Sequence, residues 1–358
     1  MWLWLRMQLR LQLLLLLFCL LIGFNPILVL GASANIYTDE EPVHQCERGH
    51  LIPKKKRHRI YDCIIFNHEF ELLEIRINEL HQEVSFFVIV ESEVTFTNLK
   101  RSTNSNSTWS NISERLAQFT NQIILISLES LEGSTTWERE AYLRNTLLNL
   151  DLYPTMAKPN VGDVFIVSDV DEIPRPSILR SLAACEGIFP NENAPYLALN
   201  MQMSYYSFCN VDTSEPWGLS KALLYTEEVA HQLVKKELTA SKLRTGIKEI
   251  TVLNDAGWHC SFCFQAISQF RHKLNSFSHT EYNLAELKKP EHIVSCIKDG
   301  KDLLGRAWVK FPLRECEAKT SAPMYVLSNV KRFQYLLDRR SSTAELSDVE
   351  WWRDHGRA

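Results

Sequence analysis

Glycine and proline are scarce in this 358-residue sequence, which contains only 12 and 13 of them. This scarcity excludes collagen-like and low-complexity chains, which need these residues in abundance. An excess of one charge is also missing, because 39 Lys and Arg face 43 Asp and Glu. Without a strongly basic field, no nucleic acid partner is expected. Apolar residues make up 45% and charged residues 23%, a composition that favours a folded globular domain over a disordered chain or a multi-span membrane protein.

The N-terminal part of the chain carries a long apolar run, from residue 11 to residue 30. About 20 such residues are enough to span a bilayer as a helix. Two arginines precede the run and three acidic residues follow it at 39–41, so the positive-inside rule leaves the rest of the chain in the lumen. A cleaved signal peptide is the alternative, because Ala32-Ser33-Ala34 resembles a cleavage site. Both interpretations export the remaining chain.

The export signal, and the weak hydrophobic periodicity of the stretch after it, predict how the chain is divided into segments. It comprises a cytosolic tail (1–10), a signal-anchor transmembrane helix (11–30), a stem (31–60), a single lumenal domain (61–340) and a C-terminal tail (341–358).

Cysteine usage agrees with export. Eight of the nine cysteines follow the apolar run, and this even number permits up to four disulfides. Cys260 and Cys263 have a spacing found in redox and zinc sites, but an oxidising compartment favours a structural disulfide. Two glycosylation sequons begin at Asn106 and Asn111, in a polar run typical of an exposed loop.

Short apolar runs alternate with helical patterns in the first half of the chain. The helical pattern at 72–80 lies between two of these runs, and another at 137–150 follows the third. Such alternation predicts an α/β domain in which helices cover a mostly parallel central sheet, with ligands beyond the carboxyl ends of the strands. The runs that predict buried strands are 63–66, 86–90, 123–126 and 164–167, and less regular strands are possible at 197–209, 221–225 and 249–253.

Three carboxylates, Asp169, Asp171 and Glu172, directly follow the apolar run at 164–167. In an extended segment, Asp169 and Asp171 point to the same face at about 6.6 Å along the chain. Two anions this close repel each other unless they share a cation. A hard divalent ion would satisfy both and bridge to an anionic ligand such as a diphosphate. The alternative is an exposed turn that caps a helix at 176–182, because Asp-x-Asp alone is a weak motif.

Several blocks of sequence, taken in order, resemble glycosyltransferase family 17. The resemblance runs from about Tyr61 to Leu337, and its blocks are FNHEFELLE (66–74), FVIVES (87–92), DVDEIP (169–174), GWHCSFCF (257–264) and RFQYLLD (332–338). It implies a GT-A-like nucleotide-sugar transferase domain in a type II Golgi membrane protein. It also implies UDP-N-acetylglucosamine as the donor, and Mn²⁺ or another divalent cation at the Asp-x-Asp motif. The implied reaction adds N-acetylglucosamine to a mannose of an N-glycan in β-1,4 linkage.

Within this resemblance, Asp171 is expected to coordinate the metal directly. Asp169 would bind the ribose hydroxyls or reach the metal through water, Glu172 would orient either aspartate, and His279 is a further candidate metal ligand. The expected donor-binding residues are Asn67, Glu69, Glu91, Asp169, Trp258 and His259. For Asn67 the alternative is a helix cap, for Glu91 a cap or a solvated loop residue, and for His259 a core residue.

Transfer from an α-linked sugar nucleotide to a β-glycoside inverts the configuration, so one carboxylate should act as general base on the acceptor hydroxyl. The sequence leaves four candidates for this base: Glu281, Asp255, Glu172 and Glu138. Arg271 and Lys273 could offset the charge of the leaving diphosphate, or form a solvated helix face. Two other classes of function are a glycoside hydrolase with Asp169 and Asp171 as its carboxylate pair, and a non-catalytic glycan-binding protein.

Overall fold

A computed structural model describes residues 46, 51–100, 108–190, 194–213, 216–247, 250–307, 309, 311, 322–341 and 343–350. The anchor expected at 11–30 and the sequon residue Asn106 lie outside these described residues. Within them, no helix is both long enough and apolar enough to cross a bilayer.

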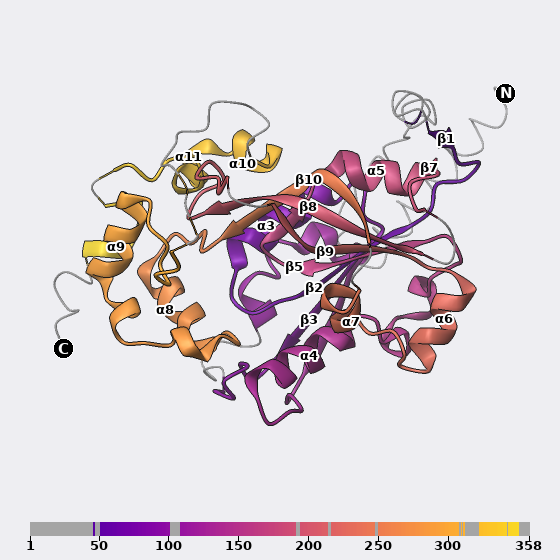
Figure 1. Ribbon diagram of the computed structural model, residues 1–358, viewed down its shortest axis with the longest axis horizontal. Coiled ribbons are helices and arrows are strands. Elements are labelled where there is room, and N and C mark those ends of the chain that lie inside the picture. Colours follow the sequence, from indigo (N-terminus) through magenta and orange to yellow (C-terminus); the bar gives the residue numbers. More distant parts are fainter. Residues whose placement is uncertain are drawn as a thin grey trace, which may run out of the picture. The chain divides into compact units, whose positions relative to one another are not determined.

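An eight-stranded mixed sheet forms the centre of the described chain (Figure 1). β9 and β6 run antiparallel to their neighbours, whereas the other six strands of this sheet all point in one direction. Six carboxyl ends are therefore gathered at one edge. In spatial order the strands are β4 (Ile123–Leu128), β3 (Phe86–Ser92), β2 (Ile60–Ile65), β5 (Val164–Asp169), β9 (Trp217–Leu224), β8 (Tyr196–Tyr205), β10 (Thr251–Ser261) and β6 (Glu172–Pro174).

The four strands predicted from the apolar runs are confirmed as β2, β3, β4 and β5, and they form the parallel half of the sheet. The other half is mixed, because β9 lies antiparallel between β5 and β8. The expectation of a mostly parallel sheet is therefore confirmed in that six of the eight strands point in one direction. The pairings of β9 and β6, however, are antiparallel. β1 (Ile52–Pro53) and β7 (Cys185–Glu186) form a separate antiparallel pair.

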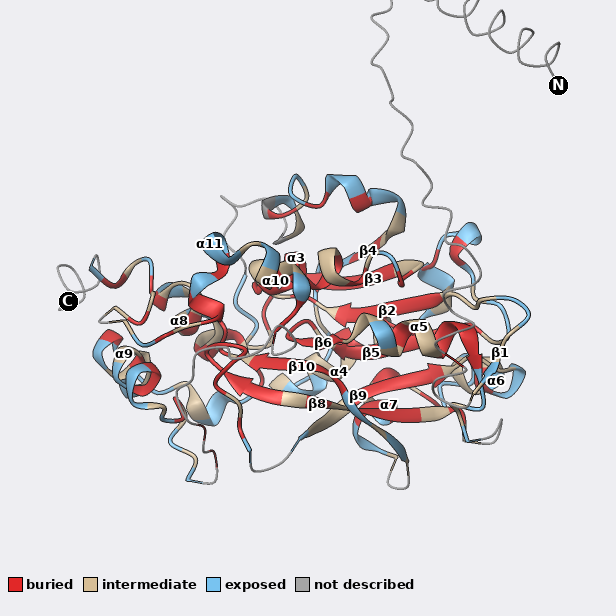
Figure 2. Cartoon of the chain, turned by 90° about the horizontal axis from the view of Figure 1, so that it is seen from above, coloured by how far each residue is buried: buried red, intermediate tan, exposed pale blue. Residues whose placement is uncertain are grey.

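Helices cover both faces of the sheet (Figure 1), and the strands are buried for most of their length (Figure 2). The two faces follow from the alternation of side chains along each strand, because Ile60 and Ile64 enter one core and Tyr61 and Cys63 enter the other. The first core is covered by α3 (Phe70–Leu80), α5 (Pro176–Ala184) and α10 (Met324–Ser328), and the second by α4 (Thr136–Thr146), α6 (Glu227–Val234) and α7 (Ala240–Thr245).

A third core lies beyond the carboxyl ends of β8 and β10, where it is built largely on α8 (Ile267–Ser276) and α9 (Pro290–Asp299). α11 (Val330–Phe333) packs near α10 and contributes Phe333 to the first core. α8 brings Lys273 to the strand ends, and the segment after it brings Phe277, Ser278 and His279. These residues contribute to the site described below.

Disulfides connect parts of the described chain, as export predicts. Cys46 pairs with Cys185, and Cys260 pairs with Cys263 directly after β10, which confirms a disulfide at the CxxC motif. Cys209 is disulfide-bonded as well. Cys63 and Cys296 are buried free thiols, so fewer than the four permitted bridges form.

Candidate functional site

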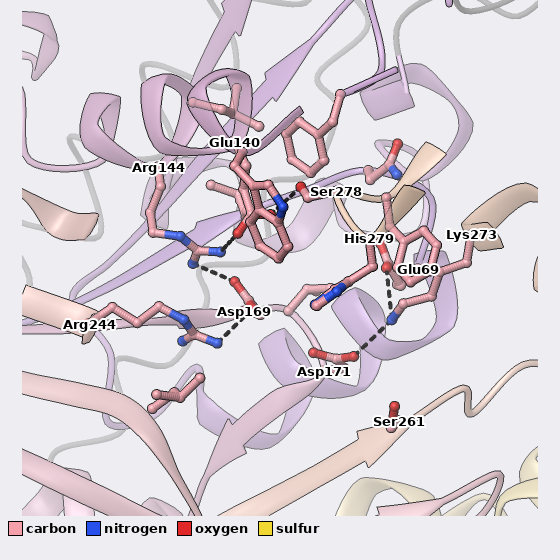
Figure 3. Close-up of a pocket in the computed structure, with 18 of the residues that line it drawn as sticks. Glu69, Glu140, Arg144, Asp169, Asp171, Arg244, Ser261, Lys273, Ser278 and His279 are labelled. Atoms are coloured by element: carbon pink, nitrogen blue, oxygen red, sulfur yellow. Dashed lines mark hydrogen bonds and ion pairs between the residues drawn. The ribbon is translucent and has the colours of Figure 1, made fainter. Parts of the chain in front are cut away.

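A cavity of about 500 Å³ lies at the carboxyl ends of the parallel strands (Figure 3). Its walls come from the segments that follow β2, β3 and β5, from α4 and α7, and from the end of β10 and α8. Ligands of α/β sheets bind at this edge. The sequence-predicted residues that line it are Asn67, Glu69, Asp169, Asp171, His259, Lys273 and His279.

The acidic motif bends instead of continuing as a strand. β5 ends at Asp169, the chain turns at residues 170 and 171, and β6 begins at Glu172. The fully buried Arg76 of α3 fixes this turn by donating to the carbonyl oxygens of Asp169, at 2.8 Å, and of Glu172, at 2.6 Å. The turn directs Asp169 and Asp171 to different partners, which corrects the expectation that the two carboxylates share one cation.

Asp169 lies between two arginines (Figure 3). Its Oδ1 accepts from Arg144 of α4 at 2.5 Å, and its Oδ2 accepts from Arg244 of α7 at 2.7 Å. Arg144 also donates to Glu140, one turn earlier on the same helix, at 2.6 Å. Sequence reasoning missed both arginines, because they lie 25 and 75 residues from Asp169. The available signal was the i,i+4 pair of Glu140 and Arg144 on one helix face.

Asp171 faces a different set of cationic and polar groups. Its Oδ2 accepts from Lys273 Nζ at 3.1 Å and lies 3.7 Å from His259 Nε2. The same ammonium group lies 3.6 Å from Glu69 Oε1. Burial by itself would raise the pKa of Asp171, but Lys273 and His259 lower it well below its usual range. Burial likewise opposes the charge on Lys273, but Asp171 and Glu69 raise its pKa. Both groups are therefore charged at neutral pH.

Glu172 and Glu281, both expected to take part in catalysis, lie outside the cavity lining. Glu172 is fully buried and accepts from Trp217 Nε1 at 2.5 Å, from Ser220 Oγ at 2.6 Å and from Arg244. It organises the wall behind the site. Glu281 is half-exposed and pairs with His279 Nδ1 at 2.7 Å.

Two of the expected donor-binding residues also lie elsewhere. Glu91 is buried and accepts from the backbone N–H of Trp109 and from Ser127 Oγ, each at 2.9 Å. Trp258 packs against Arg175, whose guanidinium lies 4.4 Å from the indole ring. Because neighbouring residues of a strand point to opposite faces, His259 can reach the cavity while Trp258 is buried in the core.

The remaining candidates for the general base have other contacts. Glu138 caps α4 by accepting from Ser134 and from the backbone N–H of Thr135. Asp255 pairs with Arg175 at 2.5 Å. Two carboxylates that sequence reasoning did not consider for this role, Glu69 and Glu140, do line the cavity.

Aromatic side chains gather on one wall of the cavity. Trp137 of α4 is 50% exposed, and its ring meets His279 edge-on at 4.5 Å between centroids. Phe277 lies 5.8 Å from the same His279 ring. Exposed aromatic rings of this kind suit the apolar face of a sugar ring or a nucleobase.

The described residues offer no cluster of three or more His, Cys, Asp or Glu that could enclose a metal ion. Both carboxylate oxygens of Asp169 accept hydrogen bonds from arginines, and His279 is paired with Glu281. Asp171 is ionised and lines the cavity. Cations such as Mg²⁺ are commonly held by one or two carboxylates together with substrate phosphates. Asp171 is therefore a lining carboxylate that would hold a metal bound together with a diphosphate.

Comparison with known proteins gives a family for this chain. The model of "Glycosyltransferase family 17" matches residues 35–342. The β-1,4-mannosyl-glycoprotein 4-β-N-acetylglucosaminyltransferase of Homo sapiens is 26% identical over 340 residues, covering 86% of this chain and 60% of that protein. The Rattus norvegicus protein of the same name is 26% identical over 322 residues, covering 80% and 56%. The chain thus spans somewhat more than half the length of these relatives.

Among solved structures, glucosyl-3-phosphoglycerate synthase from Mycobacterium tuberculosis, with Mn²⁺, UDP and phosphoglyceric acid, is 12% identical with a TM-score of 0.28. The match covers 62% of this chain and 74% of that chain. The family model, in contrast, covers most of the sequence and all of the cavity lining. The chain belongs to glycosyltransferase family 17.

Proposed function

We propose that this chain transfers N-acetylglucosamine from UDP-N-acetylglucosamine to a mannose of an N-glycan in β-1,4 linkage, with inversion. Family membership and the printed names of its relatives support the reaction. The observation that carries the proposal is the cavity at the strand ends, where Asp171 is kept ionised beside Lys273 in a site large enough for a ligand.

The cationic groups of this cavity suit a nucleoside diphosphate as leaving group. Arg144, Arg244 and Lys273 all line it, and each is held in place by carboxylates from other segments. Fixed positive groups stabilise the negative charge that develops on a departing diphosphate, because they need not reorganise during the reaction. A divalent cation such as Mn²⁺, held by Asp171, would supply further stabilisation of the same charge.

The acceptor and the sugar need a surface of different chemistry. Trp137 and Phe277 present aromatic rings at the cavity, and rings of this kind pack on sugars and bases. The general base must reach the acceptor hydroxyl within hydrogen-bonding distance. We therefore place it among the carboxylates that line the cavity, Glu69 and Glu140, in preference to Glu172 or Glu281.

We also propose that the chain is a single-pass type II protein of the Golgi membrane with its catalytic domain in the lumen. The apolar run at 11–30 supports an anchor. Disulfides at Cys185 and Cys260 support an oxidising compartment. Release as a secreted protein after cleavage near Ala34 is the alternative, and N-terminal sequencing of the expressed protein distinguishes the two.

The proposed reaction is tested by incubating the purified chain with UDP-N-acetylglucosamine, Mn²⁺ and a biantennary N-glycan. Mass spectrometry should show the gain of one N-acetylhexosamine, and NMR should show a β-1,4 linkage to mannose. Asp171→Asn should abolish the gain, whereas Asp299→Asn, on the exposed end of α9, should retain it. Failure to transfer from any UDP-sugar would reject the proposal, and glycan binding without turnover would favour a glycan-binding protein.

A further inference from the structure

We propose that Lys273 is a built-in counter-ion that keeps divalent cations away from Asp171 until a nucleoside diphosphate enters the cavity. The identity of that ligand rests on the proposed function, but the role of the lysine can be measured without any transfer reaction.

The ammonium group of Lys273 lies between two carboxylates from distant parts of the chain. Its Nζ is 3.1 Å from Asp171 Oδ2 and 3.6 Å from Glu69 Oε1, and its side chain is only 17% exposed. Figure 3 shows Lys273 pointing from α8 toward both acids. An ammonium in this position occupies the place in which a shared cation would otherwise be expected.

Two aromatic rings also lie close to the ammonium group. Nζ lies 5.4 Å from the ring centre of Phe262 and 5.6 Å from that of Phe264, distances at which a cation is attracted to the ring face. Phe262 has a left-handed backbone, with φ of 53°, inside the loop closed by the Cys260–Cys263 disulfide. The lysine is thus positioned by three separate segments and is not a mobile surface side chain.

The carboxylates of the cavity lining are paired without a metal ion. Its four carboxylates each contact a cationic side chain, since Asp169 and Glu140 pair with arginines while Asp171 and Glu69 share Lys273. Four cationic side chains line the same cavity: Arg144, Arg244, Lys273 and Arg306. Two of them also pair with carboxylates outside the lining, Arg244 with Glu172 and Arg306 with Asp302. A divalent cation that approached Asp171 alone would meet the ammonium at close range, and this repulsion weakens its binding.

A diphosphate changes this arrangement, because it brings at least two further negative charges to cations that are already paired with carboxylates. The cation and the diphosphate should then bind cooperatively, and each should raise the affinity of the other by the same factor. The lysine can contact the diphosphate while the cation takes the oxygen of Asp171. Removing the positive charge of Lys273 should therefore strengthen binding of the cation alone and weaken its coupling to the diphosphate.

The test measures Mn²⁺ binding to the full chain by electron paramagnetic resonance, with and without UDP, after correction for the Mn²⁺–UDP complex in solution. For the wild type, UDP should raise the Mn²⁺ affinity about tenfold or more. Lys273→Met should bind Mn²⁺ alone about tenfold more tightly than the wild type and show a smaller effect of UDP. Lys273→Arg keeps the charge and should behave as the wild type, as should Lys298→Met on the exposed face of α9.

Two results would overturn the inference: wild type that binds Mn²⁺ alone as tightly as with UDP, or Lys273→Met that leaves Mn²⁺ binding unchanged. Circular dichroism verifies that each variant is folded, and the comparison within the wild type does not depend on any variant. Absence of UDP binding to the wild type would count against the proposed function instead. In that case tighter binding of Mn²⁺ alone by Lys273→Met would still support the counter-ion.

Discussion

Arg76 is buried completely beneath the turn that carries Asp169 and Asp171. Its guanidinium pairs with the buried Asp62 at 2.6 Å and donates to Ser168 Oγ at 2.6 Å, in addition to its bonds to the turn. An arginine in this position supports the acidic motif from below, although it does not reach the cavity lining. Arg76 therefore contributes to the site indirectly, because it fixes the backbone that carries Asp169 and Asp171.

Arg76→Met leaves the carboxylate of Asp62 buried without its counter-ion. Because breaking a buried pair from one side costs about 3–5 kcal/mol, we expect a fall of that size in the free energy of unfolding. Urea denaturation measures it. Lys301→Met, which removes an exposed pair with Asp299, should change stability little and serves as the control. Equal effects of the two substitutions would contradict the supporting role of Arg76.

Lys221 of β9 is a buried lysine whose Nζ donates to the carbonyl oxygen of Gly218 at 2.5 Å. Burial, and to a smaller extent Arg244, lower its pKa from 10.5 to about 8. Between these two values the unfolded chain carries a proton that the folded chain has lost. Stability should therefore rise with pH from about 8 to about 10.5 on account of this group.

Lys221→Met removes this titration from the folded and the unfolded chain alike. The free energy of unfolding should increase by about 1–3 kcal/mol at pH 7, and its dependence on pH between 8 and 10 should become flatter. Urea denaturation at several pH values, compared with the wild type, is the measurement. An unchanged slope would mean that Lys221 keeps its ordinary pKa in the folded protein.

At the scale of elements, the two described disulfides with known partners have different roles. Cys46 and Cys185 are 139 residues apart, so their bridge restricts the unfolded chain strongly. Cys260 and Cys263 are three residues apart, and their loop places Ser261 and Phe262 at the cavity. The first bridge should therefore act on stability and the second on the site.

Replacing both cysteines of one bridge by serine separates these roles. The Cys46→Ser, Cys185→Ser variant should lose about 2–5 kcal/mol of unfolding free energy and retain its affinity for UDP. The Cys260→Ser, Cys263→Ser variant should lose little stability but bind UDP about fivefold more weakly, because the cavity wall is no longer preorganised. Thermal unfolding and calorimetric titration with UDP provide the two readouts, and the opposite assignment of effects would contradict this account.

The parallel half of the fold could be predicted from the sequence, because strands buried on both faces leave continuous apolar runs. The run at 164–167 located β5 within two residues of its end, and the helical spacing at 72–80 located α3. The mixed half of the sheet was harder to predict from the sequence. Its strands β8 and β9 are joined by a loop, and parts of them face polar groups. Their direction depends on contacts that no local pattern records.

The part of the candidate site that follows the strand ends could be predicted from the sequence. Asp169, Asp171 and Glu69 follow strands and converge as the carboxyl-edge rule predicts. Lys273 of α8 joins them, in agreement with one of its two interpretations, a group that offsets the charge of a diphosphate. Arg144 and Arg244 were not predicted, because charged residues on helices resemble a solvated surface until the tertiary fold is known. Glu172 was assigned to catalysis for its position in the motif, yet the turn after Asp169 sends its side chain into the buried wall.

At the scale of the whole described domain, the sheet and its charges define one reaction site. Six strands end at the edge where the cavity lies. The carboxylate, lysine and arginine side chains there come from α4, α7 and α8, from the end of β5 and the turn after it, and from the segments after β2 and α9. The full sequence has a net charge of only −4. Recognition of the proposed anionic donor would therefore depend on this local arrangement and not on the overall field.

The most direct test of the central claim is a crystal structure of the chain with UDP and Mn²⁺. We expect the diphosphate to lie in the cavity within contact distance of Lys273, with Mn²⁺ between it and Asp171. UDP bound elsewhere on the protein, with this cavity empty, would contradict the account.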